Sequence, residues 1–220
     1  MDDSSIPGII LLTGPKHSGK TSVGRILAVL LGAGFINLDE LIERQTGKSP
    51  RSLYKEGAEV FRLAETQALA SLLPNAGIIP ENSSPGGVRV VAAGGGLIDN
   101  PDALELLRGP GKNTLARGMV YLEVTADTAW ERIEAASLLT GELPPFLNTE
   151  NPRETHAVLH ARRGAVYREL ASLSIAAEGK TAEDIGREIA ARIVRSPITA
   201  IGDHCDQRSL GNWHPIKFLL

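Results

Sequence analysis

The chain has 220 residues, and a chain of that length gives one α/β domain a substantial core but is too short for two such domains of ordinary size. The formal net charge of −3, with no dominant basic stripe, argues against nucleic acid as the main partner, and a single cysteine excludes an intrachain disulfide. Residues 1–7 lack the order of a signal peptide and no apolar stretch is long enough to span a bilayer, so we expect a cytoplasmic protein with no membrane partner. We also expect a monomer.

Short apolar runs alternate along the chain with amphipathic stretches. Most of the apolar runs are continuous, which is typical of strands buried on both faces of a parallel sheet. We expect strands at 8–13, 34–38, 88–93, 119–124 and 173–177. We expect helices at 20–31, 39–46, 58–73, 102–107, 128–136, 152–170 and 182–195. This alternation predicts a doubly wound α/β fold whose ligands gather at the carboxyl ends of the strands.

A phosphate-binding loop pattern lies between the first strand and the first helix. Residues 14–21 read Gly-Pro-Lys-His-Ser-Gly-Lys-Thr, which completes the pattern G-x-x-x-x-G-K-[ST]. A loop that leads into a helix N-terminus directs several backbone N–H groups at one point, where the helix dipole adds partial positive charge. We expect Lys20 to reach the β- and γ-phosphates of a nucleoside triphosphate and the Thr21 hydroxyl to bind Mg²⁺. The predicted nucleotide site comprises Gly14, Pro15, Lys16, His17, Ser18, Gly19, Lys20, Thr21 and Ser22.

Asp39 follows directly after the second expected strand, at a carboxyl end of the sheet. A carboxylate in that place can accept a proton, or orient the attacking oxygen, when an alcohol attacks a γ-phosphate. Aspartate is also a preferred N-cap residue, so Asp39 is equally explained as the cap of the following helix. The residues alone leave both interpretations open.

Two further motifs suggest an anion site. Arg62 lies three residues before Glu65 on an expected helix, where the carboxylate can brace the guanidinium for a planar anion, although such pairs are more commonly surface ion pairs. Gly94, Gly95 and Gly96 follow the third strand, and three glycines at that position let the backbone approach a ligand closely. A flexible turn is the alternative for the glycines.

The expected helix at 152–170 carries two features. Arg163 and Tyr167 share one of its faces, with Arg162 beside them, so a second arginine could converge with Arg62 on one carboxylate. His156 and His160 are four residues apart and could chelate a metal, but no third ligand is evident. An ordinary solvated helix face therefore explains the two histidines better.

Taken together, these motifs resemble the shikimate kinase family. In order, the chain reads G-x-x-x-x-G-K-T-S-V-G-R, F-x-x-x-D-x-x-I-E, G-x-x-x-F-R-x-x-E, G-G-G, V-Y-L-E and R-x-x-x-Y, and the similarity extends from about residue 8 to residue 195. Many kinases share the loop, whereas Asp39, Arg62 and the three glycines in this order are far more specific.

The resemblance implies a P-loop NTPase of the nucleoside monophosphate kinase type, in which helices flank both faces of a five-stranded parallel sheet. The kinase domain would span 1–195 with a lid at about 138–155, and 196–220 would be a C-terminal extension of unknown role. The family transfers the γ-phosphate of ATP to the 3-hydroxyl of shikimate, in the pathway to chorismate and the aromatic amino acids, with Mg²⁺ as cofactor.

The resemblance also implies roles for individual residues. Lys20 and Asp39 would be catalytic, with Asp39 contacting the ring hydroxyls of shikimate as base or orienter. Arg62 and Arg163 would hold the substrate carboxylate, and Gly94, Gly95 and Gly96 would line the acceptor pocket. Arg132 would lie near the adenine.

The chain departs from the family pattern at three places. Asn37 replaces the first aspartate of an Asp-x-Asp pair, so it can join Thr21 in holding Mg²⁺ only through a water of the metal's shell, and metal affinity should fall. Residues 144–147 read Pro-Pro-Phe-Leu instead of Arg-Pro-Leu-Leu, so the lid arginine is absent. We expect Arg153 or Arg162 to replace it when the lid closes. His17 stands where the family commonly has a loop glycine, which we expect to be a small effect.

We therefore expect a shikimate kinase, with two alternatives. One is a related kinase for gluconate or another small hydroxy acid. The other is a nucleotide-binding regulator that has lost catalysis, for which Asn37 and the absent lid arginine are the evidence. The extension at 196–220 contains Cys205 and two histidines, but their spacing matches no zinc pattern, and we expect a poorly ordered or surface-packed tail.

Overall fold

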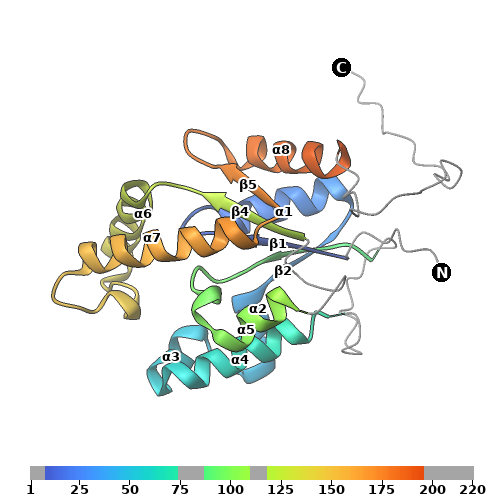
Figure 1. Cartoon of the computed structure of the whole chain (residues 1–220). Coiled ribbons are helices and arrows are strands. Elements are labelled where there is room, and N and C mark those ends of the chain that lie inside the picture. The colour runs from blue at the N-terminus through green and yellow to red at the C-terminus, as the bar shows by residue number, and fades with distance from the viewer. Residues whose placement is uncertain (1–7, 74–86, 110–117, 196–220) are drawn as a thin grey trace, which may run out of the picture.

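The computed structural model describes residues 8–73, 87–109 and 118–195, and the tail at 196–220 lies outside these ranges. Its centre is a five-stranded sheet in the order β2-β3-β1-β4-β5 (Figure 1). The strands are β1 (Ile9–Thr13), β2 (Gly34–Asn37), β3 (Arg89–Ala92), β4 (Met119–Glu123) and β5 (Leu173–Ala176). All four neighbouring pairs are parallel, which confirms the expected sheet. Because β1 lies between β3 and β4, the strand order reverses there, and ligands are expected at its carboxyl end.

The helices lie close to the expected ranges, with one addition. They are α1 (Lys20–Leu31), α2 (Leu38–Thr46), α3 (Pro50–Glu56), α4 (Ala58–Ala70), α5 (Pro101–Arg108), α6 (Ala126–Thr140), α7 (Pro152–Leu170) and α8 (Ala182–Arg195), with short 3₁₀ turns η1 (Leu97–Asp99) and η4 (Pro145–Leu147). We did not expect α3. Its start follows from local chemistry, because the Ser49 hydroxyl accepts a hydrogen bond from the Ser52 N–H and Pro50 occupies the first turn.

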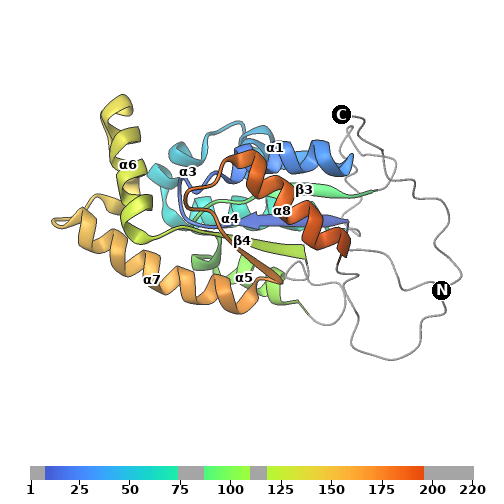
Figure 2. The ribbon, with the colours of Figure 1, turned by 90° about the horizontal axis from the view of Figure 1, so that it is seen from above.

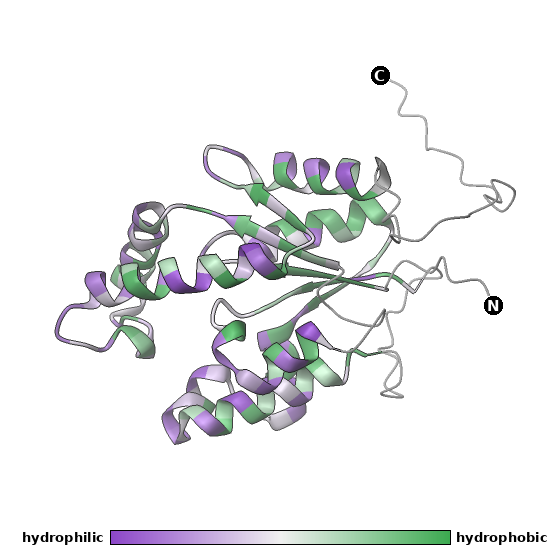
Figure 3. Ribbon diagram, viewed as in Figure 1, coloured by the Kyte–Doolittle hydropathy of each residue, from purple (hydrophilic) through white to green (hydrophobic). Residues whose placement is uncertain are grey.

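Helices cover both faces of the sheet, as Figures 1 and 2 show. Alternate residues of β1 point into different cores: Ile9 and Leu11 pack with α2, α4, α5 and α7, whereas Ile10 and Leu12 pack with α1 and α8. Figure 3 shows the hydrophobic residues on the strands and on the inner sides of the helices. The three central strands β3, β1 and β4 are therefore buried on both faces, as continuous apolar runs predict, whereas the edge strand β5 exposes Ser174 and Ala176.

A third, smaller apolar cluster connects α6, η4 and α7. Trp130, Ile133 and Leu147 are buried in it, and Phe146 packs against its edge. The segment that we expect to act as a lid is thus attached to the rest of the domain through apolar contacts. Among the described residues, the structure contains no helix with the length and hydrophobicity that a membrane span requires.

Candidate active site

The phosphate-binding loop joins β1 to α1 and holds Lys20 at its centre. The Lys20 amine donates hydrogen bonds to the carbonyl oxygens of Gly14 and Pro15 at 3.0 and 2.6 Å, and lies 3.3 Å from the Ser18 hydroxyl oxygen. Burial lowers the pKa of Lys20 to about 8, although the nearby Asp39 carboxylate opposes the shift. The loop therefore holds a poorly solvated amine that gains from the arrival of an anion.

Four of the predicted nucleotide-site residues lie in this loop or beside it. His17 has a φ of 60°, in the left-handed region that a glycine adopts more easily, and its carbonyl oxygen accepts a hydrogen bond of 3.0 Å from Arg132 Nη1. Arg132 thus links α6 to the loop, and its role beside adenine stays a prediction. Thr21 and Ser22 are exposed in the first turn of α1, so their hydroxyl groups are open to ligands.

Asp39 lies in the first turn of α2, and Asn37 is the cap of that helix. The Asn37 Oδ1 accepts a hydrogen bond of 3.0 Å from the Asp39 N–H. The interpretation of Asp39 as an N-cap is therefore wrong. Asp39 is reached by solvent, yet the surrounding protein desolvates its carboxyl enough to raise the pKa, against the opposing charges of Lys16 and Lys20. Its carboxylate therefore faces the cations of the phosphate-binding loop.

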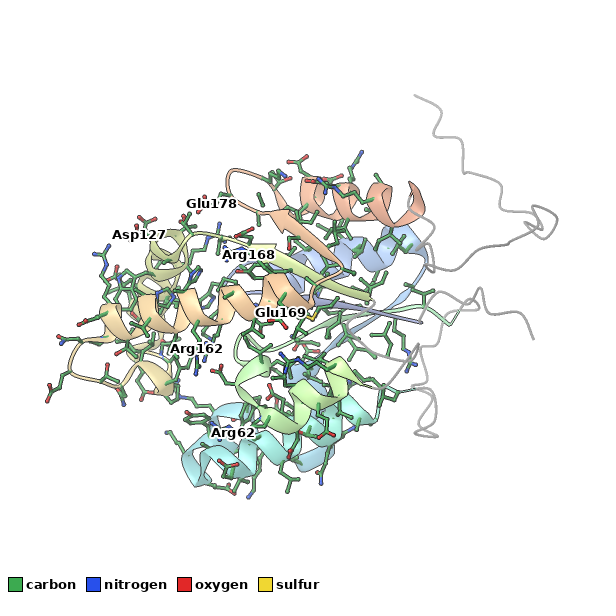
Figure 4. All side chains as sticks on the ribbon, in the orientation of Figure 1. Arg62, Asp127, Arg162, Arg168, Glu169 and Glu178 are labelled. Carbon is green, nitrogen blue, oxygen red and sulfur yellow. The ribbon has the colours of Figure 1, made fainter. Side chains whose placement is uncertain are left out.

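Glu65 does not brace Arg62, so the less favoured of the two interpretations of this motif is wrong. Arg62 instead donates to Glu59 at 2.5 Å, and its side chain is 38% exposed. Figure 4 shows Arg62 near α3 and α4, well below Arg162 of α7. Glu65 is buried and accepts a hydrogen bond of 3.1 Å from Asn100 Nδ2, and burial raises its pKa to about 7. The structure therefore places Arg62 in a surface ion pair, and its contact with a substrate carboxylate stays a prediction.

The three glycines after β3 bring the backbone close to these side chains. A Cβ at Gly95 would lie 3.0 Å from the Lys16 backbone nitrogen, and one at Gly96 would lie 3.3 Å from Arg163 Nη2. A Cβ at Gly94 would lie 3.3 Å from Glu65 Oε1 and 3.8 Å from Asp39 Oδ1. The glycines thus form a strip between the loop, the carboxylates and α7, where any larger residue would crowd its neighbours.

Arg163 of α7 is bound by a carboxylate that the motifs did not indicate. Its Nε and Nη2 donate to Asp99 Oδ2 at 2.9 and 2.6 Å, and Arg162 Nη2 donates to Asp99 Oδ1 at 2.8 Å. The Arg163 guanidinium also lies 5.2 Å from the ring centre of Phe146, a cation–π contact. On the same helix, the Tyr167 hydroxyl donates to the Gly95 carbonyl oxygen at 3.3 Å.

The two histidines of α7 are not on a solvated helix face, so that interpretation is wrong for His156. His156 is 6% exposed and its ring centre lies 5.6 Å from that of Trp130. His160 Nε2 lies 3.0 Å from the Val124 carbonyl oxygen, within hydrogen-bond distance. In the part of the chain that the structure describes, no group of three metal-ligating residues occurs. The histidines therefore belong to the packing between α6 and α7.

Some of these parts line one pocket at the carboxyl ends of the strands, whereas Lys20, Asp39 and Arg62 are not among its lining residues. The phosphate-binding loop contributes Pro15 and Lys16, the glycine strip Gly95, the lid segment Phe146, and α7 Arg163. Arg153, one of the two expected substitutes for the lid arginine, instead pairs with Asp127 and is 70% exposed. Arg162, the other, lies beside this pocket because it shares Asp99 with Arg163.

A parallel sheet of this order, with a phosphate-binding loop after β1 and an arginine across a glycine strip, defines a P-loop kinase of the nucleoside monophosphate kinase type. A family model described as shikimate kinase matches residues 16–195. The chain belongs to the shikimate kinase family.

Individual relatives agree with this assignment. The shikimate kinase of Chlorobium chlorochromatii is 35% identical over 191 residues, which cover 83% of this chain and 91% of the relative. That of Streptococcus gordonii is 36% identical over 180 residues, covering 81% and 96% respectively. The solved structure of shikimate kinase from Acinetobacter baumannii in complex with shikimate is 32% identical, with a TM-score of 0.68, and the match covers 87% of this chain and 95% of that chain.

Proposed function

We propose that this chain transfers the γ-phosphate of ATP to the 3-hydroxyl of shikimate. The observation that carries the proposal is the pocket in which Arg163 lies against Gly96 and opposite Lys16 of the phosphate-binding loop. A guanidinium binds a carboxylate through paired hydrogen bonds, so it would fix an acidic acceptor at one end. The hydroxyl groups at the other end of the acceptor would then face the loop that holds the phosphates.

Lys20 would supply the charge for the donor side of the reaction. In the structure its amine donates to carbonyl oxygens, which are weaker partners for a cation than phosphate oxygens. We infer that the amine turns to the β- and γ-phosphates when ATP binds. Because phosphoryl transfer depends chiefly on positioning and charge stabilisation, this cation would act throughout the reaction.

Asp39 would act on the acceptor hydroxyl. Partial desolvation raises the pKa of its carboxyl and so makes the carboxylate a better proton acceptor, while Lys16 and Lys20 keep it ionised. Its place beside Gly94 puts it on the same strip of backbone as the Arg163 contact. Asp39 would therefore orient the attacking oxygen or take its proton.

The residues expected to hold Mg²⁺ fit a hard cation that prefers oxygen ligands. The Thr21 hydroxyl is exposed at the start of α1. Asn37 is a weaker candidate, because its Oδ1 already caps α2. When bound, the ion would neutralise charge on the phosphates of ATP.

ADP release, measured with a coupled assay in the presence and absence of shikimate, tests the proposal. We expect release that depends on shikimate, and an Arg163→Ala variant with a strongly raised KM for shikimate. Arg168→Ala is a matched control, since Arg168 lies on the same helix and pairs with Glu123 outside the pocket. Release with gluconate but not with shikimate would contradict the proposal.

A second function has specific support. Pro144 occupies the place of the lid arginine, and Arg153 is committed to Asp127, so a regulator that binds ATP without turnover remains an alternative. Such an arginine is worth about a thousandfold or more in rate where it stabilises the transition state. We propose that Arg162, which already lies beside Arg163, leaves Asp99 and takes this role when the lid closes. Nucleotide binding without any ADP release would favour the regulator.

Membership of the family supports placing the reaction in the pathway to chorismate and the aromatic amino acids, in the cytoplasm. That the enzyme acts as a monomer stays a prediction, which light scattering checks.

A further inference from the structure

We infer that Asp99 is a positioning residue that sets the Arg163 guanidinium for the carboxylate of the acceptor. The inference rests on the proposed function and adds a residue to it. Asp99 belongs to none of the sequence motifs described above. Its carboxylate nevertheless binds Arg163, which lies both in the pocket and against the glycine strip.

The geometry of the pair divides the donors of Arg163 between two tasks. A guanidinium has five N–H groups on three nitrogens. Asp99 Oδ2 accepts from Nε at 2.9 Å and from Nη2 at 2.6 Å, so it occupies one edge of the group. The edge formed by Nη1 and the second N–H of Nη2 remains available. That edge has the paired donors that match an incoming carboxylate.

Asp99 is itself held firmly. It ends η1, directly after the glycine strip, and its N–H donates to the Gly96 carbonyl oxygen at 2.8 Å. Asn100 follows as the cap of α5, where its Oδ1 accepts from the Ala103 N–H at 3.4 Å. Arg162 binds the other carboxylate oxygen from an exposed position. The Asp99 carboxylate is therefore fixed in position, and its hydrogen bonds orient the Arg163 guanidinium.

Without Asp99, Arg163 has other partners. Glu65 is buried nearby, and the charge of Arg163 acts to lower its pKa while the charge of Asp99 acts to raise it. A released guanidinium would turn toward Glu65, and the Phe146 ring alone does not fix its edge. The cation would then be neutralised inside the protein rather than presented to the acceptor.

The test compares Asp99→Asn and Asp99→Glu with the parent in steady-state kinetics. We expect Asp99→Asn to raise the KM for shikimate about tenfold, the loss of one charge-assisted hydrogen bond, with kcat within about twofold. Asp99→Glu keeps the charge and should recover part of the loss. Glu169→Gln is the matched control, because it breaks another carboxylate–arginine pair between α7 and α5 and should leave both constants unchanged.

A neutral acceptor separates positioning from a general structural effect. With the methyl ester of shikimate, which lacks the carboxylate, the parent and Asp99→Asn should have the same KM. Thermal melting of each variant establishes that it is folded. The inference is wrong if Asp99→Asn keeps or lowers the KM for shikimate, or if the ester is affected as strongly as the acid.

Failure of this inference is distinct from failure of the proposed function. A parent protein that releases no ADP with shikimate would overturn both. An active parent whose Asp99→Asn variant has an unchanged KM would overturn the role of Asp99 alone.

Discussion

Burial of Glu65 predicts a large dependence of stability on pH, which Glu65→Gln should remove. The side chain is 2% exposed, and burial raises its pKa from 4.5 to about 7 in the folded protein. A folded-state pKa above the unfolded value means that this group contributes stability below pH 4.5 and that the contribution is lost as pH rises through about 7. At 1.36 kcal/mol per pKa unit, the loss amounts to about 3 kcal/mol.

Glutamine keeps the shape of the side chain and an oxygen that can accept from Asn100 Nδ2, but it carries no charge at any pH. The stability of Glu65→Gln relative to the parent should therefore rise by about 2.5 kcal/mol between pH 5 and pH 8, because part of the total change already occurs below pH 5. Urea denaturation at four pH values across this range measures it. Glu59→Gln removes an exposed carboxylate of the same helix and should follow the parent within about 1 kcal/mol. Parallel curves for the parent and Glu65→Gln would refute the reasoning.

Three further outcomes are expected. Because burial lowers the pKa of Lys20 to about 8, the amine is about half protonated at pH 8, and ADP binding should make it take up about half a proton. Calorimetry in buffers of different ionisation enthalpy detects this uptake, and Lys20→Met should show none. Burial also lowers the pKa of His156, so the folded protein loses stability as pH falls below about 6.5 and the imidazole must be protonated in the interior. The stability of His156→Leu relative to the parent should therefore be greater at pH 5 than at pH 7. An equal difference at both pH values would contradict this. Aspartate caps helices as well as asparagine does, so Asn37→Asp should keep the stability of α2 while lowering the Mg²⁺ concentration needed for half-maximal ADP release; an unchanged magnesium requirement would remove Asn37 from the metal site.

The strands and most helices could be predicted because their signals are local. Continuous apolar runs locate β1 and β4, and the loop pattern places Lys20 at the start of α1. The seven residues of α3 were missed because so short a helix shows little periodicity, although Ser49 and Pro50 carry a start signal.

The pairings within the site were harder to predict, since spacing cannot choose between equivalent neighbours. Glu59 and Glu65 each lie three residues from Arg62, so either could pair with it. Arg62 pairs with Glu59 because Asn100, 35 positions away in the chain, holds Glu65 in the interior. Asp99 was missed for the same reason, because only the fold brings it to α7.

The absence of a side chain at Gly95 has a consequence for the distance that the phosphoryl group would cross in the proposed reaction. A Cβ at this position would meet only main-chain atoms of the phosphate-binding loop, among them the Lys16 backbone nitrogen at 3.0 Å. Main-chain atoms cannot move aside by changing a rotamer, so we expect the backbone to set the separation of the two substrates. Gly95→Ala would therefore push the two substrates apart and slow turnover, while leaving the affinity for each substrate unchanged.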